Sequence, residues 1–313
     1  MKEENLYISP GPHIFSKEST PKMMKDAIIA LVPAIFASIY FFKAKAFILL
    51  LVSIISCVAF EAAIQFLMKR KITIFDRSAI VTGILFAMVM PPSLPIWACI
   101  LGCFVAIGLA KQLFGGLGAN IFNPALLGRA FLVAAFPAFM TRWNHPVSLD
   151  AVTGATPLGL VKFGHSLDIN YWDLFVGNVS GSLGETSALA LVIGGLYLLI
   201  KKTIDWRIPS AYIGTVFVIS FVANLISPDV RVGGLFHILA GGLLIGAIFM
   251  AADPVTSPIT KTGRWVFGIG CGAITMVIRL WGGLPEGVMY SILLMNALTP
   301  LLNRMTRPRR YGT

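Results

Sequence analysis

The sequence predicts an all-α polytopic membrane protein with ten transmembrane helices arranged as two inverted five-helix repeats. The prediction rests on the composition, on ten apolar segments and on an internal repeat. Hydrophobic residues make up 57% and charged residues 12% of the 313 positions, and the mean hydropathy is +0.82. In soluble domains roughly a quarter of the residues are charged. The lipid bilayer is therefore the expected environment of most of the chain.

Ten apolar segments give the expected helices in order. They span 26–42, 46–68, 79–90, 95–111, 120–140, 187–200, 209–226, 235–252, 264–280 and 286–301. A helix needs about 20 residues to cross a bilayer, so the third and sixth segments are short. The third ends in the string MPPSLP, and proline cannot continue a helix because it lacks the backbone N–H donor.

Lysine and arginine predict the orientation. The net charge of +11 does not predict nucleic-acid binding, because the basic residues lie in short clusters between the apolar segments. With the N-terminus in the cytoplasm, 18 of the 25 lysines and arginines fall in inside segments and six in outside segments. Cytoplasmic loops carry such an excess. We therefore expect both termini in the cytoplasm and residues 141–186 on the outer face.

An internal repeat relates the two halves of the chain. GILFAMVMPPSLP at 83–95 resembles GAIFMAADPVTSP at 246–258, and QLFGGLGANIFNPALL at 112–127 resembles RLWGGLPEGVMYSILL at 279–294. Five segments per half is an odd number, so the second half enters the membrane from the opposite side. In such repeats, interrupted helices at corresponding positions mark a binding site near the midplane. The expected divisions are 1–140, a first repeat with an N-terminal tail, 141–186, an outer loop, and 187–313, a second repeat with a basic tail.

The predicted outer loop contains the string LDAVTGATPLG at 149–159. A threonine hydroxyl is a weak nucleophile unless a neighbouring base activates it. Thr153 and Thr156 are therefore better candidates for acceptors that another enzyme modifies. Gly154 and Ala155 would leave the approach to them clear, and Asp150 stands upstream. An ordinary turn would explain the same string without any modification.

The string D-A-V-T-G-A-T-P-L resembles a covalent flavin-attachment motif, [ST]-G-A-T after an aspartate. That motif belongs to membrane proteins of ion-pumping redox complexes, namely the D subunit of Rnf complexes and the B subunit of sodium-pumping NADH:quinone oxidoreductases. GGLGANIFNPALLGRAF and FMAADPVTSP are also similar to stretches of this family, so the resemblance covers essentially the whole chain. It implies a urea-channel-like fold. It also implies FMN on Thr156 through a phosphoester bond, made by a flavin transferase on the outer face.

The resemblance further implies a role in a complex of the bacterial cytoplasmic membrane. Electrons would pass between ferredoxin and NAD in partner subunits, coupled to Na⁺ or H⁺ translocation. The partners would be other membrane and peripheral subunits, including a second FMN-bearing subunit, and the short N-terminal tail favours the D subunit of an Rnf complex. The chain has no G-x-G-x-x-G fingerprint after a strand and no iron–sulfur cysteine set. It therefore carries no complete active site, and no metal site is expected.

The fifth apolar segment contains two asparagines near its start and an arginine further along. Asn120 and Asn123 are three residues apart, on one face of the expected helix. Their amides would either read the polar edge of a ring or cap the helix, and the resemblance implies a non-covalent riboflavin in this region. Arg129 lies deeper in the same segment, where an intramembrane charge indicates function. It would hold a flavin, pair with an acid or tie helices together.

Two acids lie within apolar segments, Glu61 in the second and Asp253 at the end of the eighth. Either would bind a cation or shuttle a proton, or would form an interhelical salt bridge, for instance with Arg129. A solute channel of the urea-channel type, without a redox role, is the alternative function. Such a channel has no use for a TGAT string. A scaffold for other redox subunits is a third, and a bound flavin would exclude it.

Overall fold

The computed structural model describes residues 19–144, 146, 155–163, 170–226 and 233–308. All regular elements in this part of the chain are helices, which confirms the all-α class. They are α1 (Thr20–Leu67), the 3-10 helix η1 (Ile74–Asp76), α2 (Ser78–Met88), α3 (Ile96–Phe104), the π-helix η2 (Val105–Gln112), α4 (Pro124–Ala135), α5 (Pro137–Met140), α6 (Pro157–Lys162), α7 (Tyr171–Val176), α8 (Ala188–Ile200), α9 (Arg207–Ile226), α10 (Gly234–Leu239), α11 (Leu243–Ile245), the π-helix η4 (Gly246–Met250), α12 (Lys261–Trp281) and α13 (Val288–Met305).

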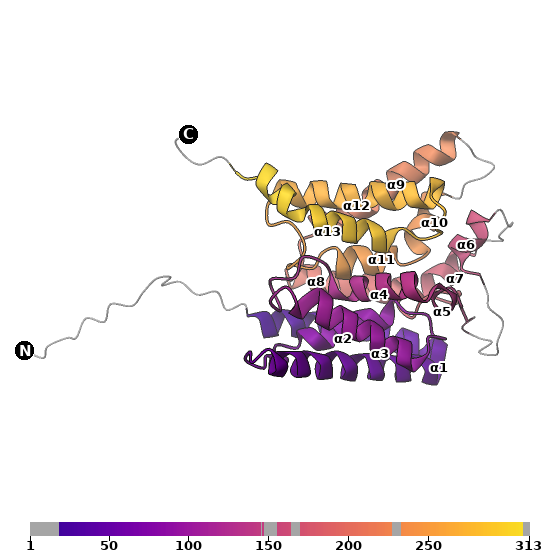
Figure 1. The fold of residues 1–313 in the computed structure, drawn as a ribbon. Helices are drawn as coiled ribbons and strands as arrows, with labels where there is room; N and C mark the ends of the chain where they lie inside the picture. The colour runs from indigo at the N-terminus through magenta and orange to yellow at the C-terminus, as the bar shows by residue number, and fades with distance from the viewer. Residues whose placement is uncertain (1–18, 145, 147–154, 164–169, 227–232, 309–313) are drawn as a thin grey trace, which may run out of the picture.

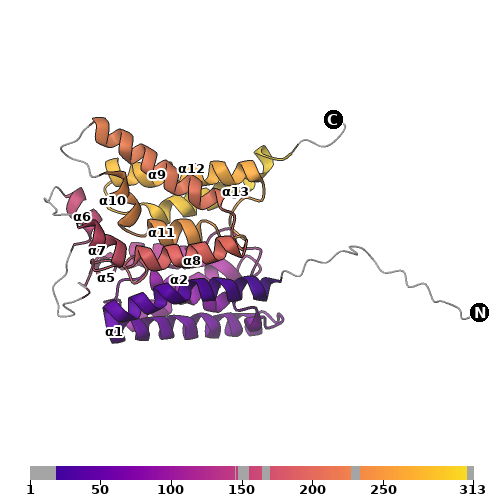
Figure 2. The ribbon, with the colours of Figure 1, turned by 180° about the vertical axis from the view of Figure 1, so that it is seen from behind.

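Helix α1 has 48 residues and contains two helices, one on each side of Lys43, which correspond to the first two predicted segments. Lys43 interrupts it with φ 52° and ψ −132°, outside the helical region. A non-glycine residue rarely adopts positive φ, and here that conformation reverses the chain. The two arms of α1 consequently run side by side (Figure 2).

Helices break where glycine and proline lie. The predicted break after the third segment is confirmed, since α2 ends at Met88 and α3 begins at Ile96. The eighth segment was predicted as one helix, which is wrong, because Gly241 separates α10 from α11 with φ 73°. Glycine adopts this left-handed conformation without a steric penalty. The fifth helix begins only at Pro124, after a capping asparagine.

The helices form two groups that meet at α4 and α8. Helices α1 to α4 lie in the lower half of the view and α9 to α13 in the upper half (Figure 1). Contacts of α8 with α1 and of α13 with α4 join the groups. Helix α1 begins and α13 ends at one end of the bundle, the termini side. Helices α5, α6 and α7 lie at the opposite end, the loop side (Figure 1).

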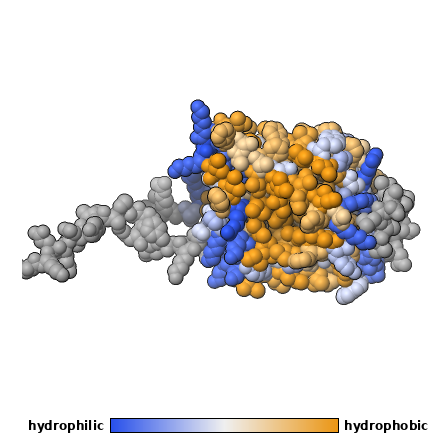
Figure 3. Space-filling model, turned by 90° about the horizontal axis from the view of Figure 1, so that it is seen from below, coloured by the Kyte–Doolittle hydropathy of each residue, from blue (hydrophilic) through white to orange (hydrophobic). Residues whose placement is uncertain are grey.

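The surface is that of a membrane protein. On the face seen in Figure 3, hydrophobic residues cover the middle of the bundle and hydrophilic residues lie at both ends. Within the described residues, α1, α9 and α12 are long and apolar enough to cross a membrane. Shorter apolar helices accompany them, including Ser78–Met88 and Ala188–Ile200. The expected membrane class is therefore confirmed, while the division at residues 140 and 186 stays a prediction.

Candidate functional site

A pocket on the termini side gathers three of the predicted site residues. It lies between the start of α1, the end of η2, the segment before α4 and the segment after η4, with about 800 Å³ of free space including its mouth. The polar residues that line it include Ser78, Lys111, Asn120, Asn123 and Asp253. Apolar side chains, among them Leu85 and Phe249, form much of the rest. An apolar cavity with a few convergent polar groups is typical of a small-molecule site.

The two asparagines have different roles in this pocket. Asn123 caps α4, since its Oδ1 accepts a hydrogen bond from the Leu126 N–H at 3.2 Å, which confirms the capping interpretation. The Asn120 Nδ2 donates to the Phe122 carbonyl at 3.3 Å, whereas its Oδ1 is buried without a partner among the described residues. A buried unpaired acceptor costs about 1–3 kcal/mol. The Asn120 Oδ1 is therefore free to accept a hydrogen bond from a ligand in the pocket.

Asp253 lies at the same pocket, in the turn after η4. Its Oδ1 accepts a hydrogen bond from the Val255 N–H at 3.2 Å, and the Thr256 hydroxyl lies 3.5 Å from Oδ2. The hypothetical salt bridge between Asp253 and Arg129 does not form in the structure. Arg129 lies instead toward the loop side, where its guanidinium contacts Glu286, so it does not share the asparagine pocket.

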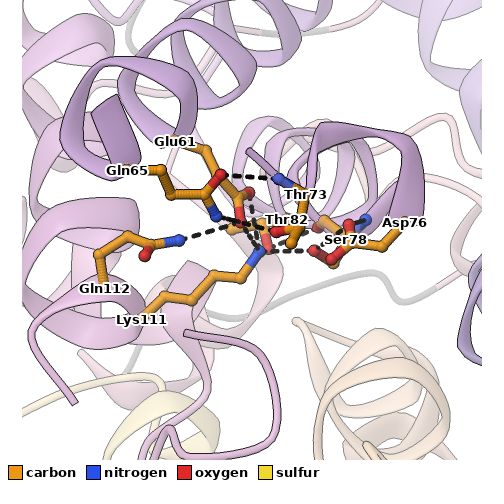
Figure 4. A network of polar contacts seen from close by, with 8 residues as sticks. All are labelled: Glu61, Gln65, Thr73, Asp76, Ser78, Thr82, Lys111 and Gln112. Carbon is orange, nitrogen blue, oxygen red and sulfur yellow. Dashed lines mark hydrogen bonds and ion pairs between the residues drawn. The ribbon is translucent and has the colours of Figure 1, made fainter. Parts of the chain in front are cut away.

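Glu61 forms a buried ion pair with Lys111 (Figure 4). The Lys111 Nζ lies 2.7 Å from one carboxylate oxygen and 2.8 Å from the other, and both side chains are at most 1% exposed. Gln112 and Gln65 donate further hydrogen bonds to the carboxylate, at 3.0 and 3.3 Å. Both charges are therefore paired and hydrogen-bonded, as buried charges must be. In the sequence, Lys111 indicated only the membrane orientation, and its pairing with Glu61 was not predicted.

This network leads from the interior to the termini side. Lys111 also donates to the Ser78 hydroxyl at 2.5 Å, and that hydroxyl donates to the Asp76 carboxylate at 2.6 Å (Figure 4). The π-helix η2 carries Lys111 near its end, and π-helical turns frequently occur at functional sites. A continuous set of polar groups from a buried carboxylate to a half-buried one can pass a proton or guide a cation.

Thr156 lines a second pocket, on the loop side. This pocket has about 580 Å³ of free space including its mouth, and Leu158, Glu185, Gly241 and Glu286 also line it. Thr156 is half-buried at the N-terminus of α6, and its hydroxyl oxygen accepts a hydrogen bond from the Gly159 N–H at 3.1 Å.

The rest of the predicted motif is only partly visible. Ala155 is exposed beside Thr156, whereas Asp150, Thr153 and Gly154 lie outside the described residues. Helix α6 is tied to the bundle by Lys162, whose Nζ donates to the carbonyls of Ile278 and Arg279 at 3.2 and 2.8 Å. Burial lowers the pKa of Lys162.

Two glutamates near this pocket were missed by the sequence analysis. Glu286 accepts a hydrogen bond from Arg129 at 3.1 Å, and Glu185 lies 3.7 Å from the same guanidinium. Both are charged residues inside otherwise apolar stretches, GSLGETSAL and GGLPEGVM. That signal could have found them, because a buried arginine needs acidic partners.

Comparison with known proteins gives a consistent result. The model of the NQR2, RnfD, RnfE family matches residues 7–312. The D subunit of the Na(+)-translocating ferredoxin:NAD(+) oxidoreductase complex of Acetobacterium woodii is 49% identical, over 100% of this chain and 97% of the relative. The D subunit of the proton-translocating ferredoxin:NAD(+) oxidoreductase complex of Clostridium ljungdahlii is 44% identical, over 100% and 98%. The D subunit of the ion-translocating oxidoreductase complex of Stutzerimonas stutzeri is 43% identical, over 95% and 93%.

Proposed function

Because the chain belongs to the NQR2, RnfD, RnfE family, we propose that it is the flavin-bearing membrane subunit of an Rnf-type ion-translocating ferredoxin:NAD(+) oxidoreductase. One observation carries the flavin part of the proposal. Thr156, the last residue of the TGAT string, lines the loop-side pocket with its side chain half-buried. The pocket opens beside Thr156 and would receive the ring of an attached FMN, and a flavin transferase supplies the activation that threonine lacks.

A second flavin, riboflavin held without a covalent bond, belongs to the termini-side pocket. Flavins supply one- and two-electron transfer, and a hydrocarbon core about 30 Å thick separates the two ends of the bundle. A carrier between them shortens each electron-transfer step. In this chain the unpartnered Asn120 Oδ1 would accept a hydrogen bond from the ring. Asn123 would hold the start of α4 in place beside it.

The proposed architecture is ten membrane crossings in two inverted repeats, with both termini in the cytoplasm and Thr156 outside. Helix α1 begins and α13 ends at the same end of the bundle (Figure 1). This supports an even number of crossings, because an even number returns the chain to the side on which it started. A Ser148→Cys variant should react with an impermeant thiol reagent in intact cells, and Thr306→Cys should not. The reverse pattern would overturn the orientation.

Glu61 and Asp253 are the proposed carboxylates of the ion pathway. Glu61 is supported by the polar network that joins it through Lys111 and Ser78 to the termini side. Asp253 is supported by its place at the termini-side pocket. Of two relatives with comparable sequence identity to this chain, 49% and 44%, one is named as part of a Na(+)-translocating complex and the other as part of a proton-translocating complex. The proposal therefore covers either ion.

In-gel fluorescence tests the covalent flavin. The denatured chain, made together with a flavin transferase, should fluoresce under ultraviolet light, because only a covalent flavin survives denaturation. Thr156→Ala should be dark, and Thr153→Ala should retain fluorescence. A dark wild-type band beside a fluorescent control target would refute the proposal and leave the channel or scaffold functions.

Acid-extractable flavin tests the second site. Asn120→Leu removes the unpartnered oxygen and should lower the riboflavin recovered from the purified protein, while FMN remains on Thr156. Asn120→Asp is the matched control, because it keeps an acceptor oxygen at the same place and should retain more riboflavin. Equal extractable flavin in the wild type and Asn120→Leu would exclude Asn120 as a ligand.

A further inference from the structure

Next to the loop-side pocket, Arg129 contacts two carboxylates that come from distant segments of the chain. The Arg129 Nη2 donates to Glu286 Oε2 at 3.1 Å, and its Nη1 lies 3.7 Å from Glu185 Oε1. The other Glu286 oxygen accepts a hydrogen bond from the Gly242 N–H at 2.6 Å. Both glutamates line the pocket that Thr156 lines, and Arg129 contacts them from outside that lining. The guanidinium therefore pairs with both carboxylates and fixes their positions.

Glu185 is held by its backbone as well as by Arg129. The N–H groups of Leu183 and Gly184 donate to the carbonyls of Met90 and Met88, at 3.1 and 2.6 Å, where α2 breaks. A Cβ at Gly184 would lie 2.9 Å from the Met88 carbonyl oxygen, so only glycine permits this approach. The segment that carries Glu185 is thus paired to the end of a broken helix, and the carboxylate has a defined position.

One oxygen of Glu185 is left without a hydrogen bond. Glu185 Oε2 accepts from the Ser182 N–H at 3.3 Å, whereas Oε1 is buried and has no hydrogen-bond partner among the described residues. The Arg129 guanidinium, 3.7 Å from it, lies beyond hydrogen-bond distance. A carboxylate oxygen that is desolvated without a donor is costly. Since Glu185 lines the pocket, a ligand in that pocket can supply the missing donor.

We propose that Glu185 recognises the flavin ring carried by Thr156, with its Oε1 accepting a hydrogen bond from the N–H of the pyrimidine edge. Arg129 is the positioning residue that holds the carboxylate for this contact. This inference rests on the proposed covalent FMN and adds the part of the protein that holds the ring. The pyrimidine edge of a flavin presents one N–H between two carbonyl oxygens, so a single fixed acceptor orients it.

Two further features favour a ring over a metal cation in this pocket. The guanidinium of Arg279 lies close to Glu286, because its Nη2 and the Glu286 Oε1 are both 3.2 Å from the place that a Cβ at Gly241 would take. It donates to the carbonyls of His237 and Ala240, at 2.5 and 3.2 Å. The two arginines thus balance the two glutamates, and no net negative charge attracts a cation. The apolar side chain of Leu158 also lines the pocket. It can pack against a flat ring and offers a cation no ligand.

The test compares the full-length chain made with and without the flavin transferase. Thermal unfolding and iodide quenching of the attached flavin are measured for the wild type, Glu185→Leu and Glu185→Gln. FMN should stabilise the wild type by several degrees, and Glu185→Leu should lose most of that gain. Its quenching constant should rise several-fold, because the released ring faces water. Glu185→Gln keeps an acceptor oxygen and should restore much of both properties.

Asp173→Asn is the control, because it neutralises a carboxylate on α7 that does not line the pocket. It should leave the FMN-dependent gain in stability and the quenching constant unchanged. If Glu185→Leu does not fold, Glu185→Asp, which shortens the side chain by one methylene, should still show raised quenching. Equal FMN stabilisation and equal quenching in the wild type and the Glu185 variants would overturn the inference. A wild-type chain without FMN on Thr156 would instead refute the proposed function.

Discussion

Replacing Lys111 by methionine should strongly destabilise the protein. The change leaves the Glu61 carboxylate, which is 0% exposed, without its cation, and only the amides of Gln65 and Gln112 still donate to it. Breaking a buried ion pair by removing one partner costs about 3–5 kcal/mol. Since about 1 kcal/mol shifts the melting temperature of a large domain by roughly 2–4 °C, the expected loss is of the order of 10 °C.

The double variant Glu61→Gln with Lys111→Met should recover most of this loss. A neutral amide can use the same glutamine partners, and replacing both members of a buried pair is often close to neutral. All four cysteines are free and buried, so a thiol-reactive fluorophore reports unfolding directly. Lys71→Met, at an exposed position, is the control and should change stability by less than about 0.5 kcal/mol. Equal destabilisation of the single and double variants would refute the reasoning.

Two further predictions concern the packing and the termini-side loops. Gly184→Ala should destabilise the protein by about 1–3 kcal/mol, because the new Cβ would lie 2.9 Å from a backbone oxygen. Gly214→Ala is the control and should not destabilise it, because nothing lies within 4 Å of a Cβ there. Equal melting temperatures of the two variants would contradict this. Burial raises the pKa of Asp205, but hydrogen bonds and charges from Arg207 and Arg264 outweigh it and hold the pKa below 3.8. The stabilisation is therefore complete above about pH 4 and is lost as the pH falls through the pKa of Asp205 in the folded protein. The melting temperature of Asp205→Asn should consequently fall less at acid pH than that of the wild type. An equal fall in both proteins would contradict a stabilising role for the contacts of Asp205 with Arg207 and Arg264.

Local chemistry made much of the fold predictable from the sequence. The hydrophobic segments gave the membrane class, and MPPSLP gave the end of α2. The break at Gly241 was missed because a glycine pair inside an apolar segment is also compatible with a continuous helix. The first two segments correspond to the two helices on either side of Lys43, but the conformation of Lys43 was not predictable because lysine seldom adopts positive φ.

The sequence predicted which residues belong to the site better than it predicted which residues they contact. Glu61 required a cation or a cavity, but only the tertiary structure shows Lys111 as that cation, 50 residues away. Asn120 and Asp253 share a pocket, yet no pattern in the sequence joins them across the two halves. For Arg129 the sequence left a flavin, an acid or a helix contact open, and the structure places it on the acid Glu286.

The peptide that contains Thr156 tests the central claim most directly. Trypsin cleaves after Arg142 and Lys162, so residues 143–162 form one peptide with both threonines of the motif. Mass spectrometry of protein from cells with an active flavin transferase should find this peptide heavier by one dehydrated FMN. Fragment ions should place the addition on Thr156 and not on Thr153. An unmodified peptide from cells that flavinylate other targets, or an addition that persists in Thr156→Ala, would contradict the account.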